Sequence, residues 1–371
     1  MDKADSGMNR RQFALAALVS AFSGRALAAG PLGFAANPLD AAEAGLVPGA
    51  SGDTTAAFAQ AAGRAAREGR PLLVRPGDYL LADAPLPEAC RIVGHGARFL
   101  AAPGRRAIAA KGRRIVLEGL AFEGVAGSGD LVSIGDAAQV DIRNCAFSSA
   151  AGSGLKLERC GGSVRDSVFA GCRDAALFSL DCKGLDIAGN EIRDCADNGI
   201  LVWQSDKRED GAMVTGNRIF RIGAASGGSG QYGNGVNVYR AGNVMVSGNR
   251  ITDCAFTAVR VNGGDNCQIV ANNCARLGEV ALYVEFAFQG AVVADNIVDT
   301  AGMGISVTNY GNAGGRLAVV SGNLVRNLFT PAYSEPRGVG IGVEADTVVS
   351  GNTVENAANF GIAAGWVLAG R

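Results

Sequence analysis

Arginine, tyrosine and amide side chains recur at alternate positions of short apolar stretches, as in "AVRVN" (258–262) and "ALYVE" (281–285). In an extended strand, successive side chains point to opposite faces. The apolar residues of each stretch therefore face a core, and the residues between them point outward. Aromatic rings can lie against sugar rings, and amide, guanidinium and carboxylate groups can hydrogen-bond sugar hydroxyls or carboxylates. These outward positions predict a surface that binds a polysaccharide.

One chemistry that fits such a surface is proton abstraction beside the carboxylate of a uronate sugar. It needs a group that neutralises the carboxylate, an acid and a base. Arg260, helped by Asn237 or Asn262, would neutralise the carboxylate. Tyr239 and Tyr283 would exchange the proton. Arg260, Tyr283 and Tyr239 are therefore the candidate catalytic residues of a uronate polysaccharide lyase or epimerase.

Binding without catalysis requires only the contacts. Six candidates for ligand binding stand at outward or loop positions: Trp203, Asn237, Asn262, Glu285, Tyr310 and Glu344. Our first interpretation is a non-catalytic polysaccharide-binding or envelope scaffold protein, with a polysaccharide or cell-envelope glycan as its partner. The lyase or epimerase is the alternative, so the sequence leaves open whether the protein is an enzyme.

A phrase of the form Gly-Asn-x-Ile recurs along the chain and must position these strands. It marks turns at Gly94, Gly119, Asn144, Asp166, Asn190, Asn217, Asn249, Asn273, Asn296, Asn323 and Asn352. The steps between these turns run from 22 to 32 residues, and a period of 20–50 residues indicates a solenoid. Each unit holds two alternating strands and no helical pattern, which selects a β-helix over a helical array.

The repeat predicts an all-β fold: a single right-handed parallel β-helix over residues 90–366, with a short N-terminal capping helix. The repeated asparagines would occupy one corner line, from Asn190 through Asn217, Asn249, Asn273, Asn296 and Asn323 to Asn352. There we expect a left-handed backbone and side-chain hydrogen bonds to the asparagines of the neighbouring coils. A β-sandwich is the rival fold, but it does not explain an asparagine that recurs in one register.

The second strand of each unit yields eight outward pairs: Lys156/Glu158, Ser179/Asp181, Leu201/Trp203, Asn237/Tyr239, Arg260/Asn262, Tyr283/Glu285, Ser306/Thr308 and Gly342/Glu344. Four insertions lie at the ends of this strand: "QSDKREDG", "GAASGGSGQYGN", "NYGNAGG" and "LFTPAYSEP". Long loops on a regular scaffold tend to carry function. We expect them to wall one continuous groove, with residues 260–285 as its floor and with Trp203 and Tyr239 on its lining.

Glycoside hydrolysis is the third possibility, because it needs two carboxyl groups about 5–9.5 Å apart. Neighbouring coils are about 4.8 Å apart. Asp181 and Glu285, four coils apart, are too distant, and Glu285 and Glu344, two coils apart, are at the limit. Glu158 and Asp181 are about one coil apart, but they lie beside Lys156, away from the centre of the groove.

The N-terminus has the layout of an export signal. The paired Arg10 and Arg11 precede an apolar run from Phe13 to Phe22 and a small-residue stretch at 26–28. The run is too short to span a bilayer, and the paired arginines resemble a twin-arginine export signal. We expect residues 1–28 to be this signal, read by the export machinery, and the mature protein to be periplasmic or secreted without a stable membrane span. An ordinary secretory signal is the alternative.

Composition excludes other classes of protein. Glycine, at 54 of 371 residues, is about twice its usual ~7% and predicts many turns. A net charge of −1 argues against a nucleic-acid partner. Nine cysteines without a C-x-x-C pair fit neither a disulfide framework nor a zinc site, so we expect free, buried thiols. His95 is the single histidine, and we expect no metal and no cofactor.

The stretch "GDTTAAF" (52–58), the strand "PGDYL" (76–80) and the asparagine corners together resemble the pectate lyase-like right-handed parallel β-helix superfamily. With the paired arginines added, residues 9–366 are similar to a family of twin-arginine-translocated β-helix repeat proteins. The resemblance implies the fold and carries over no catalytic signature. We expect residues 29–90 to hold the capping helix and first strands, and residues 91–371 the β-helix. The pattern stops at "VLAGR" after Trp366, which leaves a truncated end and an end closed by a partner both open.

Overall fold

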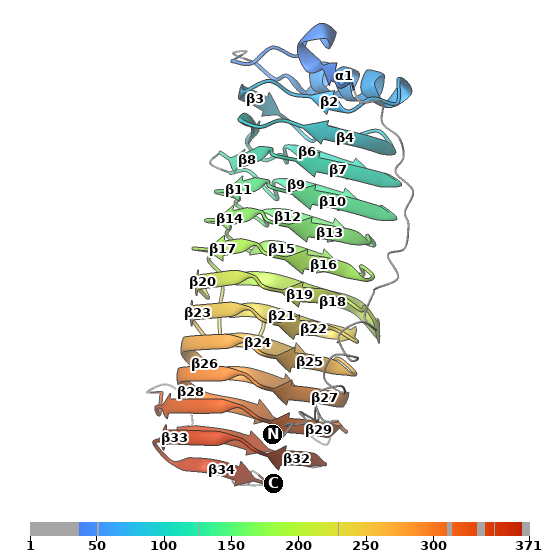
Figure 1. Cartoon of the computed structure of the whole chain (residues 1–371). Coiled ribbons are helices and arrows are strands. Elements are labelled where there is room, and N and C mark those ends of the chain that lie inside the picture. The colour runs from blue at the N-terminus through green and yellow to red at the C-terminus, as the bar shows by residue number, and fades with distance from the viewer. Residues whose placement is uncertain are drawn as a thin grey trace, which may run out of the picture. The chain divides into compact units, whose positions relative to one another are not determined.

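Each coil of the chain pairs with the coil before it and the coil after it in the computed structural model (Figure 1). The structure describes residues 37–49, 52–125, 127–228, 230–309, 314–331, 338–344 and 346–365. Within these residues, every pair of neighbouring strands is parallel, as in the pairing of β10 with β7 and β13. The described part of the chain is therefore a parallel β-helix, as the repeat predicts.

The first sheet takes one strand from each coil. Its 13 strands pair in this order: β1 (Leu39–Asp40), β2 (Leu72–Leu73), β4 (Ala89–Val93), β7 (Arg114–Glu118), β10 (Gln139–Arg143), β13 (Gly162–Arg165), β16 (Leu185–Ala188), β19 (Met213–Thr215), β22 (Met245–Ser247), β25 (Cys267–Val270), β27 (Gln289–Ala294), β29 (Arg316–Ser321) and β32 (Thr347–Ser350).

The second sheet has 21 strands and is bent along its length into two columns, which we call the first and the second column. The first column contains β3 (Gly77–Leu81), β5 (Ala97–Ala101), β8 (Ala121–Gly124), β11 (Ala146–Ser148), β14 (Val168–Ala170), β17 (Glu191–Arg193), β20 (Arg218–Ile222), β23 (Arg250–Cys254), β30 (Leu324–Leu328) and β33 (Thr353–Ala357). The second column contains β6 (Ile108–Lys111), β9 (Val132–Gly135), β12 (Leu155–Glu158), β15 (Ala175–Leu180), β18 (Asn198–Glu209), β21 (Asn234–Gly242), β24 (Thr257–Asn262), β31 (Val339–Val343) and β34 (Phe360–Ala364). Two long strands, β26 (Asn273–Glu285) and β28 (Ile297–Val307), run through both columns.

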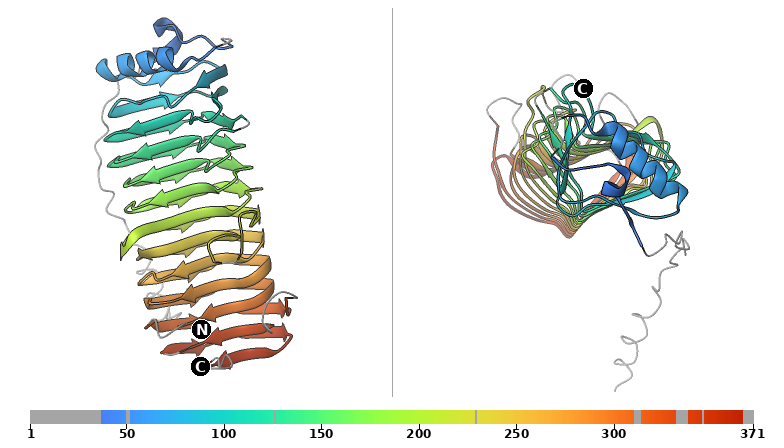
Figure 2. Two further views of the ribbon diagram at one scale, coloured as in Figure 1. Left: turned by 180° about the vertical axis from the view of Figure 1, so that it is seen from behind. Right: turned by 90° about the horizontal axis from the view of Figure 1, so that it is seen from above.

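A helix covers the end of the solenoid at its first coils, as predicted. It is α1 (Thr55–Arg67), preceded by the short 3-10 helix η1 (Ala41–Ala44), and it lies across the first strands in both views (Figures 1 and 2). Asp53 starts the helix, because its Oδ1 accepts a hydrogen bond from the Thr55 amide at 2.8 Å. Phe58 on the buried face of the helix packs 5.1 Å, centroid to centroid, from Phe99 in the core. The helix thereby shields the open edge of the first coil from solvent.

Residue 90 marks no break in this architecture. It lies inside β4, which pairs with β2 on one side and with β7 on the other. The sheet therefore continues from residue 39 through the predicted boundary between residues 29–90 and 91–371. Among the described residues, no helix has the length and apolar character that a membrane crossing requires.

An asparagine ladder holds one corner of the coils together. Each ladder asparagine donates its Nδ2 to the Oδ1 of the asparagine one coil further on, at 2.9–3.0 Å, from Asn190 to Asn352. The backbone amide of each donates to the same Oδ1, as from Asn217 to Asn249 at 2.9 Å. The members are Asn190, Asn217, Asn249, Asn272, Asn296, Asn323 and Asn352. The predicted corner line is confirmed with one correction: Asn272, and not Asn273, belongs to it.

The left-handed backbone at this corner belongs to the residue before the ladder position. Gly248 has a φ of 63° and Ala271 a φ of 57°, whereas Asn249 and Asn272 are not in the left-handed region. The prediction that the asparagine itself turns left-handed is therefore wrong. Glycine or a short polar residue makes the turn, and the asparagine is freed to bond along the stack.

The interior of the coils is apolar and close-packed. Phenylalanine rings stack from coil to coil, with Phe147 lying 5.1 Å from Phe122 and 4.6 Å from Phe169 between centroids. All nine cysteines are free and buried, as the sequence predicts. Burial raises the pKa of the Cys274 thiol to about 12, so this sulfur stays protonated and inert.

Candidate functional site

The second column carries the predicted outward side chains in two lines. Pairing of β18, β21, β24 and β26 puts Leu201, Asn237, Arg260 and Tyr283 in one line. The same pairing puts Trp203, Tyr239, Asn262 and Glu285 in the other. Four predicted pairs therefore lie side by side on adjacent coils.

Part of this surface is hollowed. The hollow has a volume of about 350 Å³, and its lining residues are Trp203, Gly230, Gln231, Asn237, Tyr239 and Asn262. Four of these six were predicted as site residues. Trp203, Tyr239 and Asn262 are half-buried. Aromatic and amide groups thus meet in a space that a ligand can enter.

The insertion at 223–233 forms one wall of the hollow. Asp197 anchors it, because its carboxylate accepts hydrogen bonds from the Ser226 amide at 2.8 Å and the Ser226 hydroxyl at 2.6 Å. Asn234 Nδ2 donates to the carbonyl oxygens of Gly230 and Tyr232 at 3.2 and 3.0 Å. Asn237 Nδ2 reaches the Gly230 carbonyl at 3.3 Å. The floor and this wall are thus hydrogen-bonded to each other.

A second insertion extends β18 beyond Trp203. Asp181 of the preceding coil holds it through the Ser205 amide and hydroxyl, both at 2.7 Å, and through an ion pair with Arg208 at 2.7 Å. Hydrogen bonds from Ser205 and the charge of Arg208 lower the pKa of Asp181 against the opposing effect of its burial. Asp181 is therefore a structural carboxylate at the base of this insertion.

An aromatic run leads from the hollow toward earlier coils. The ring centroid of Trp203 lies 5.6 Å from that of Tyr239 and 5.3 Å from that of Phe178. The Arg240 guanidinium lies 4.8 Å from the Tyr239 centroid and covers one face of that ring. Trp203 Nε1 is buried without a hydrogen-bond partner in the described part of the chain. An acceptor brought by a ligand would satisfy this donor.

Arg260, Tyr283 and Glu285 form a buried network beside the hollow. Glu285 Oε1 accepts from Arg260 Nε at 2.7 Å and from Asn262 Nδ2 at 2.9 Å, and it lies 2.5 Å from Arg260 Nη2. The Arg260 and Glu285 side chains are 9% and 1% exposed. The guanidinium also lies 4.9 Å from the centroid of Tyr283, whose hydroxyl hydrogen-bonds Glu285. These predicted residues therefore contact one another, and none of them lines the hollow.

Glu285 takes the place that a ligand carboxylate would occupy on Arg260. Burial raises the pKa of Glu285, against the attraction of Arg260 and hydrogen bonds from Tyr283 and Asn262. Because the charge of Arg260 is compensated inside the fold, the group that proton abstraction needs is already engaged. Of the three candidate catalytic residues, Tyr239 alone lines the hollow.

The remaining predicted residues lie elsewhere. Glu344 follows β31, half-buried, and its carboxylate accepts a hydrogen bond from the Asn309 amide at 2.5 Å. Tyr310 lies outside the described residues. Glu158 pairs in register with Leu180 and not with Asp181, so these two carboxylates do not face each other as hydrolysis would require.

The outward pair predicted in β15 is wrong by one residue. Ser179 is fully buried and stands in register with the inward Leu157 and Val202. Phe178 and Leu180 point outward instead. Phe178 extends the aromatic run, and it is the site residue that the sequence analysis missed.

A signal for Phe178 is present in the sequence. The ladder residue Asn190 is followed by Leu201 after 11 residues, and Asn249 by Arg260 after the same 11 residues. The residue at the ladder position of the Phe178 coil is Ser167, whose amide donates to Asn190 Oδ1 at 3.0 Å. Counting from Ser167 gives Phe178, whereas alternation alone gives either register.

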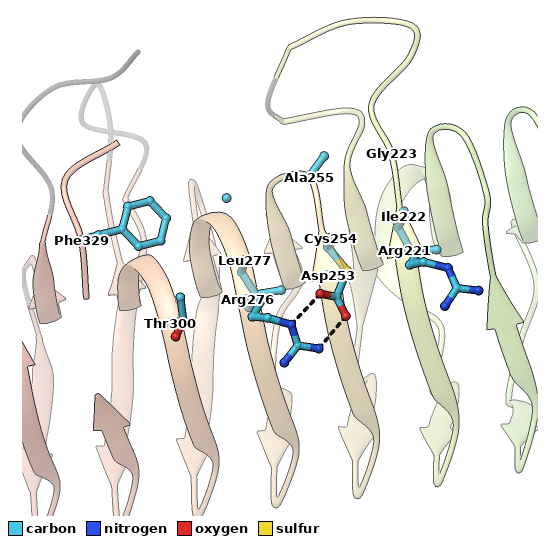
Figure 3. Close-up of a pocket in the computed structure, with 11 residues that line it drawn as sticks. Arg221, Ile222, Gly223, Asp253, Cys254, Ala255, Arg276, Leu277, Thr300 and Phe329 are labelled. Atoms are coloured by element: carbon cyan, nitrogen blue, oxygen red, sulfur yellow. Dashed lines mark hydrogen bonds and ion pairs between the residues drawn. The ribbon is translucent and has the colours of Figure 1, made fainter. Parts of the chain in front are cut away.

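A wider hollow of about 600 Å³ lies at the corner between the two columns, under the 223–233 insertion and beside Phe329 (Figure 3). Its arginines are ion-paired: Arg276 lies 2.6 Å from Asp253, and Arg221 lies 2.6 Å from Asp194. None of the predicted site residues lines it. The hollow on the second column is therefore the better candidate site.

Residues 130–325 and 198–366 of the chain match the model of a family described as right-handed β-helix region. The first match alone covers more than half of the chain, so the protein belongs to this family. The predicted right-handed parallel β-helix is confirmed. No curated protein matches the chain.

Solved structures share this fold at low sequence identity. The catalytic unit of the GH87 alpha-1,3-glucanase of Streptomyces thermodiastaticus strain HF3-3 has a TM-score of 0.57 and 16% identity, over 90% of this chain and 70% of its own. The A-module of the mannuronan C-5 epimerase AlgE4 of Azotobacter vinelandii has a TM-score of 0.61 and 12% identity, over 84% and 100%. The surface protein and adhesin PfbA of Streptococcus pneumoniae has a TM-score of 0.57 and 12% identity, over 88% and 100%. At these identities the likeness shows the fold.

Proposed function

We propose that this protein is an exported β-helix protein that binds a polysaccharide on its second column, without cleaving it. The observation that carries the proposal is the hollow in which Trp203, Tyr239, Asn237 and Asn262 meet. Tryptophan and tyrosine present large apolar faces with a polar handle, which suits the faces and hydroxyls of sugar rings. The side-chain amides each offer donors and an acceptor to hydroxyl groups.

Charge favours a neutral sugar segment in this hollow. Among its six lining residues, Tyr239 is the single one with a titratable side chain. The nearby Arg260 is neutralised by Glu285 at 2.5 Å. A neutral segment therefore meets no unpaired charge in the hollow itself, while a uronate carboxylate finds no free cation among the lining residues.

The absence of a ready set of catalytic groups on the hollow lining supports binding over catalysis. The structural likenesses fit both readings, because they include a glucanase, an epimerase and an adhesin. A uronate lyase or epimerase stays the alternative prediction, with Tyr239, Tyr283 and Arg260 as its residues. Arg260 would have to exchange Glu285 for the substrate in that case.

A panel of purified glycans separates these functions. Affinity electrophoresis of the protein in gels containing neutral or uronate polysaccharides measures retardation. Absorbance of unsaturated products and proton NMR of the uronate sugars measure elimination and epimerisation. We expect retardation by at least one neutral polysaccharide with every glycan recovered intact. Formation of an unsaturated or epimerised product would replace the binding function by the enzymatic one.

We further propose that residues 1–28 direct export of the folded protein by the twin-arginine route. The motivating residues, Arg10 and Arg11, lie outside the described residues. Arg10→Lys combined with Arg11→Lys should retain the protein inside the cell, because the pathway reads the paired guanidinium groups. Immunoblots of cytoplasmic and periplasmic fractions measure this, with Arg25→Lys as the matched control. Unchanged export of the double variant would indicate an ordinary secretory route.

A further inference from the structure

Two arginines stand in register on the outer face of the first column, away from the hollow on the second column. Arg218 on β20 pairs with Arg250 on β23, so the two backbones are about 4.8 Å apart. Both side chains are exposed, and both line one hollow of about 300 Å³ with Ile219, Phe220 and Thr252. This site belongs to a different face from the proposed polysaccharide groove.

Neither guanidinium has a carboxylate or hydrogen-bond partner in the described part of the chain. The nearest acid along the register is Glu191, which pairs with Arg218 across β17 and β20. Its carboxylate is held by Arg193 at 3.2 Å. The neighbouring arginines of the same coils each have an aspartate: Arg221 binds Asp194 and Arg276 binds Asp253 at 2.6 Å, the latter drawn in Figure 3.

The charges of this face confirm that a surplus remains. Five arginines, Arg193, Arg218, Arg221, Arg250 and Arg276, face three carboxylates, Glu191, Asp194 and Asp253. The difference is two positive charges, which equals the number of unpaired guanidinium groups. Like charges directly opposite each other on adjacent strands are destabilising. An oxyanion between them would turn this repulsion into charge-assisted hydrogen bonds.

The size of the hollow indicates more than a free ion. Its 300 Å³ compare with about 30 Å³ for one water molecule in the liquid. The Phe220 ring offers an apolar wall, one face of which is covered by the Arg221 guanidinium at 4.5 Å. The Thr252 hydroxyl offers a polar group on the opposite strand. These features fit a sugar ring that carries an oxyanion.

We propose that Arg218 and Arg250 form a second binding site that takes an acidic sugar residue through its carboxylate, sulfate or phosphate group. The site is independent of the groove, since Trp203 and Tyr239 do not line it. A polysaccharide bound there would engage the first column by charge, while the second column contacts neutral sugar segments.

Isothermal titration calorimetry at low salt tests this site. The ligands are an oligogalacturonate, a sulfated oligosaccharide, inorganic sulfate and a neutral oligosaccharide. The proteins are the parent, Arg218→Gln, Arg250→Gln and the matched control Arg276→Gln, whose guanidinium is ion-paired. We expect each of the first two variants to bind the acidic oligosaccharides at least tenfold more weakly, because a hydrogen bond to a charged group is lost. The control should bind as the parent does.

Thermal melting keeps the test independent of folding defects. Without ligand, Arg218→Gln and Arg250→Gln should melt at or above the parent temperature, since each removes a like-charge contact. Trp203→Ala should retain the acidic ligand. Equal affinity of the parent and both arginine variants would overturn the site, as would loss of the acidic ligand in Trp203→Ala. Binding of inorganic sulfate as tight as that of the sulfated oligosaccharide would overturn recognition of the sugar.

Discussion

Asn249→Ala should lower the free energy of unfolding of the solenoid by about 2–6 kcal/mol, because two buried donors lose their acceptor at about 1–3 kcal/mol each. These donors are the backbone amide and the Nδ2 of Asn217, both 2.9 Å from Asn249 Oδ1. Asn249 is 1% exposed, so water cannot replace the lost acceptor. The midpoint and slope of urea unfolding, followed by circular dichroism, measure the change.

Two further variants isolate the ladder bond. Gln268→Ala removes an exposed amide side chain from β25 and should leave the midpoint nearly unchanged. Asn249→Ser should recover part of the loss, because Ser167 already holds a ladder position and its Oγ accepts from the Cys145 amide at 3.1 Å. If Asn249→Ala unfolds at the same urea concentration as Gln268→Ala, the ladder does not hold the coils together.

Glu285→Ala should lower the free energy of unfolding by about 3–5 kcal/mol, the usual cost of leaving one member of a buried ion pair without its partner. The cost arises from the Arg260 guanidinium that stays buried, with a side chain 9% exposed. Glu285→Gln should cost less, because its amide oxygen can still accept from Arg260 and Asn262. Thermal and urea unfolding measure both variants.

The paired replacement Arg260→Met with Glu285→Leu separates attraction from desolvation. It should unfold close to the parent, because two apolar side chains replace two buried charges. Glu123→Ala is the surface control, since Glu123 pairs with Arg98 at 2.9 Å while 38% exposed, and exposed pairs contribute about 0–1 kcal/mol. A double variant as unstable as Glu285→Ala would mean that the ion pair is a net source of stability.

The repeat made the fold predictable, because one corner residue recurs once in each coil and alternation marks the strands around it. Errors arose where alternation gave no unique register. The pair Asn272 and Asn273 offers two adjacent asparagines, and only the turn residue Ala271, with its φ of 57°, decides between them. In β15, the run "AALFSL" reads equally well in either register, which exchanged Phe178 for Ser179.

The site was predictable as positions and not as contacts. Stacking of coils put Trp203 beside Tyr239, as alternation indicates. Whether Arg260 meets a ligand or Glu285 depends on side-chain rotamers and on the cover that the 223–233 insertion provides. Neither follows from spacing. Arg260→Ala, which the sequence makes a test of uronate affinity, therefore tests stability in this fold.

The polysaccharide groove is tested most directly by the affinity of Trp203→Ala for the neutral glycan that the parent binds best. Trp203 lines the hollow and is half-buried, and truncation of a central tryptophan in a binding site costs about 2 kcal/mol or more, or at least about 30-fold in Kd. Phe360→Ala, which removes a 61% exposed ring from β34, is the control. Circular dichroism should show that both variants keep the parent's strand content.

The account predicts that isothermal titration gives a Kd at least about 30-fold weaker for Trp203→Ala, with Phe360→Ala equal to the parent. Trp203→Phe should lie between them, because a smaller ring still contacts the sugar. Equal affinities for the parent and Trp203→Ala would contradict the account, since the glycan would then be held somewhere other than the hollow on the second column.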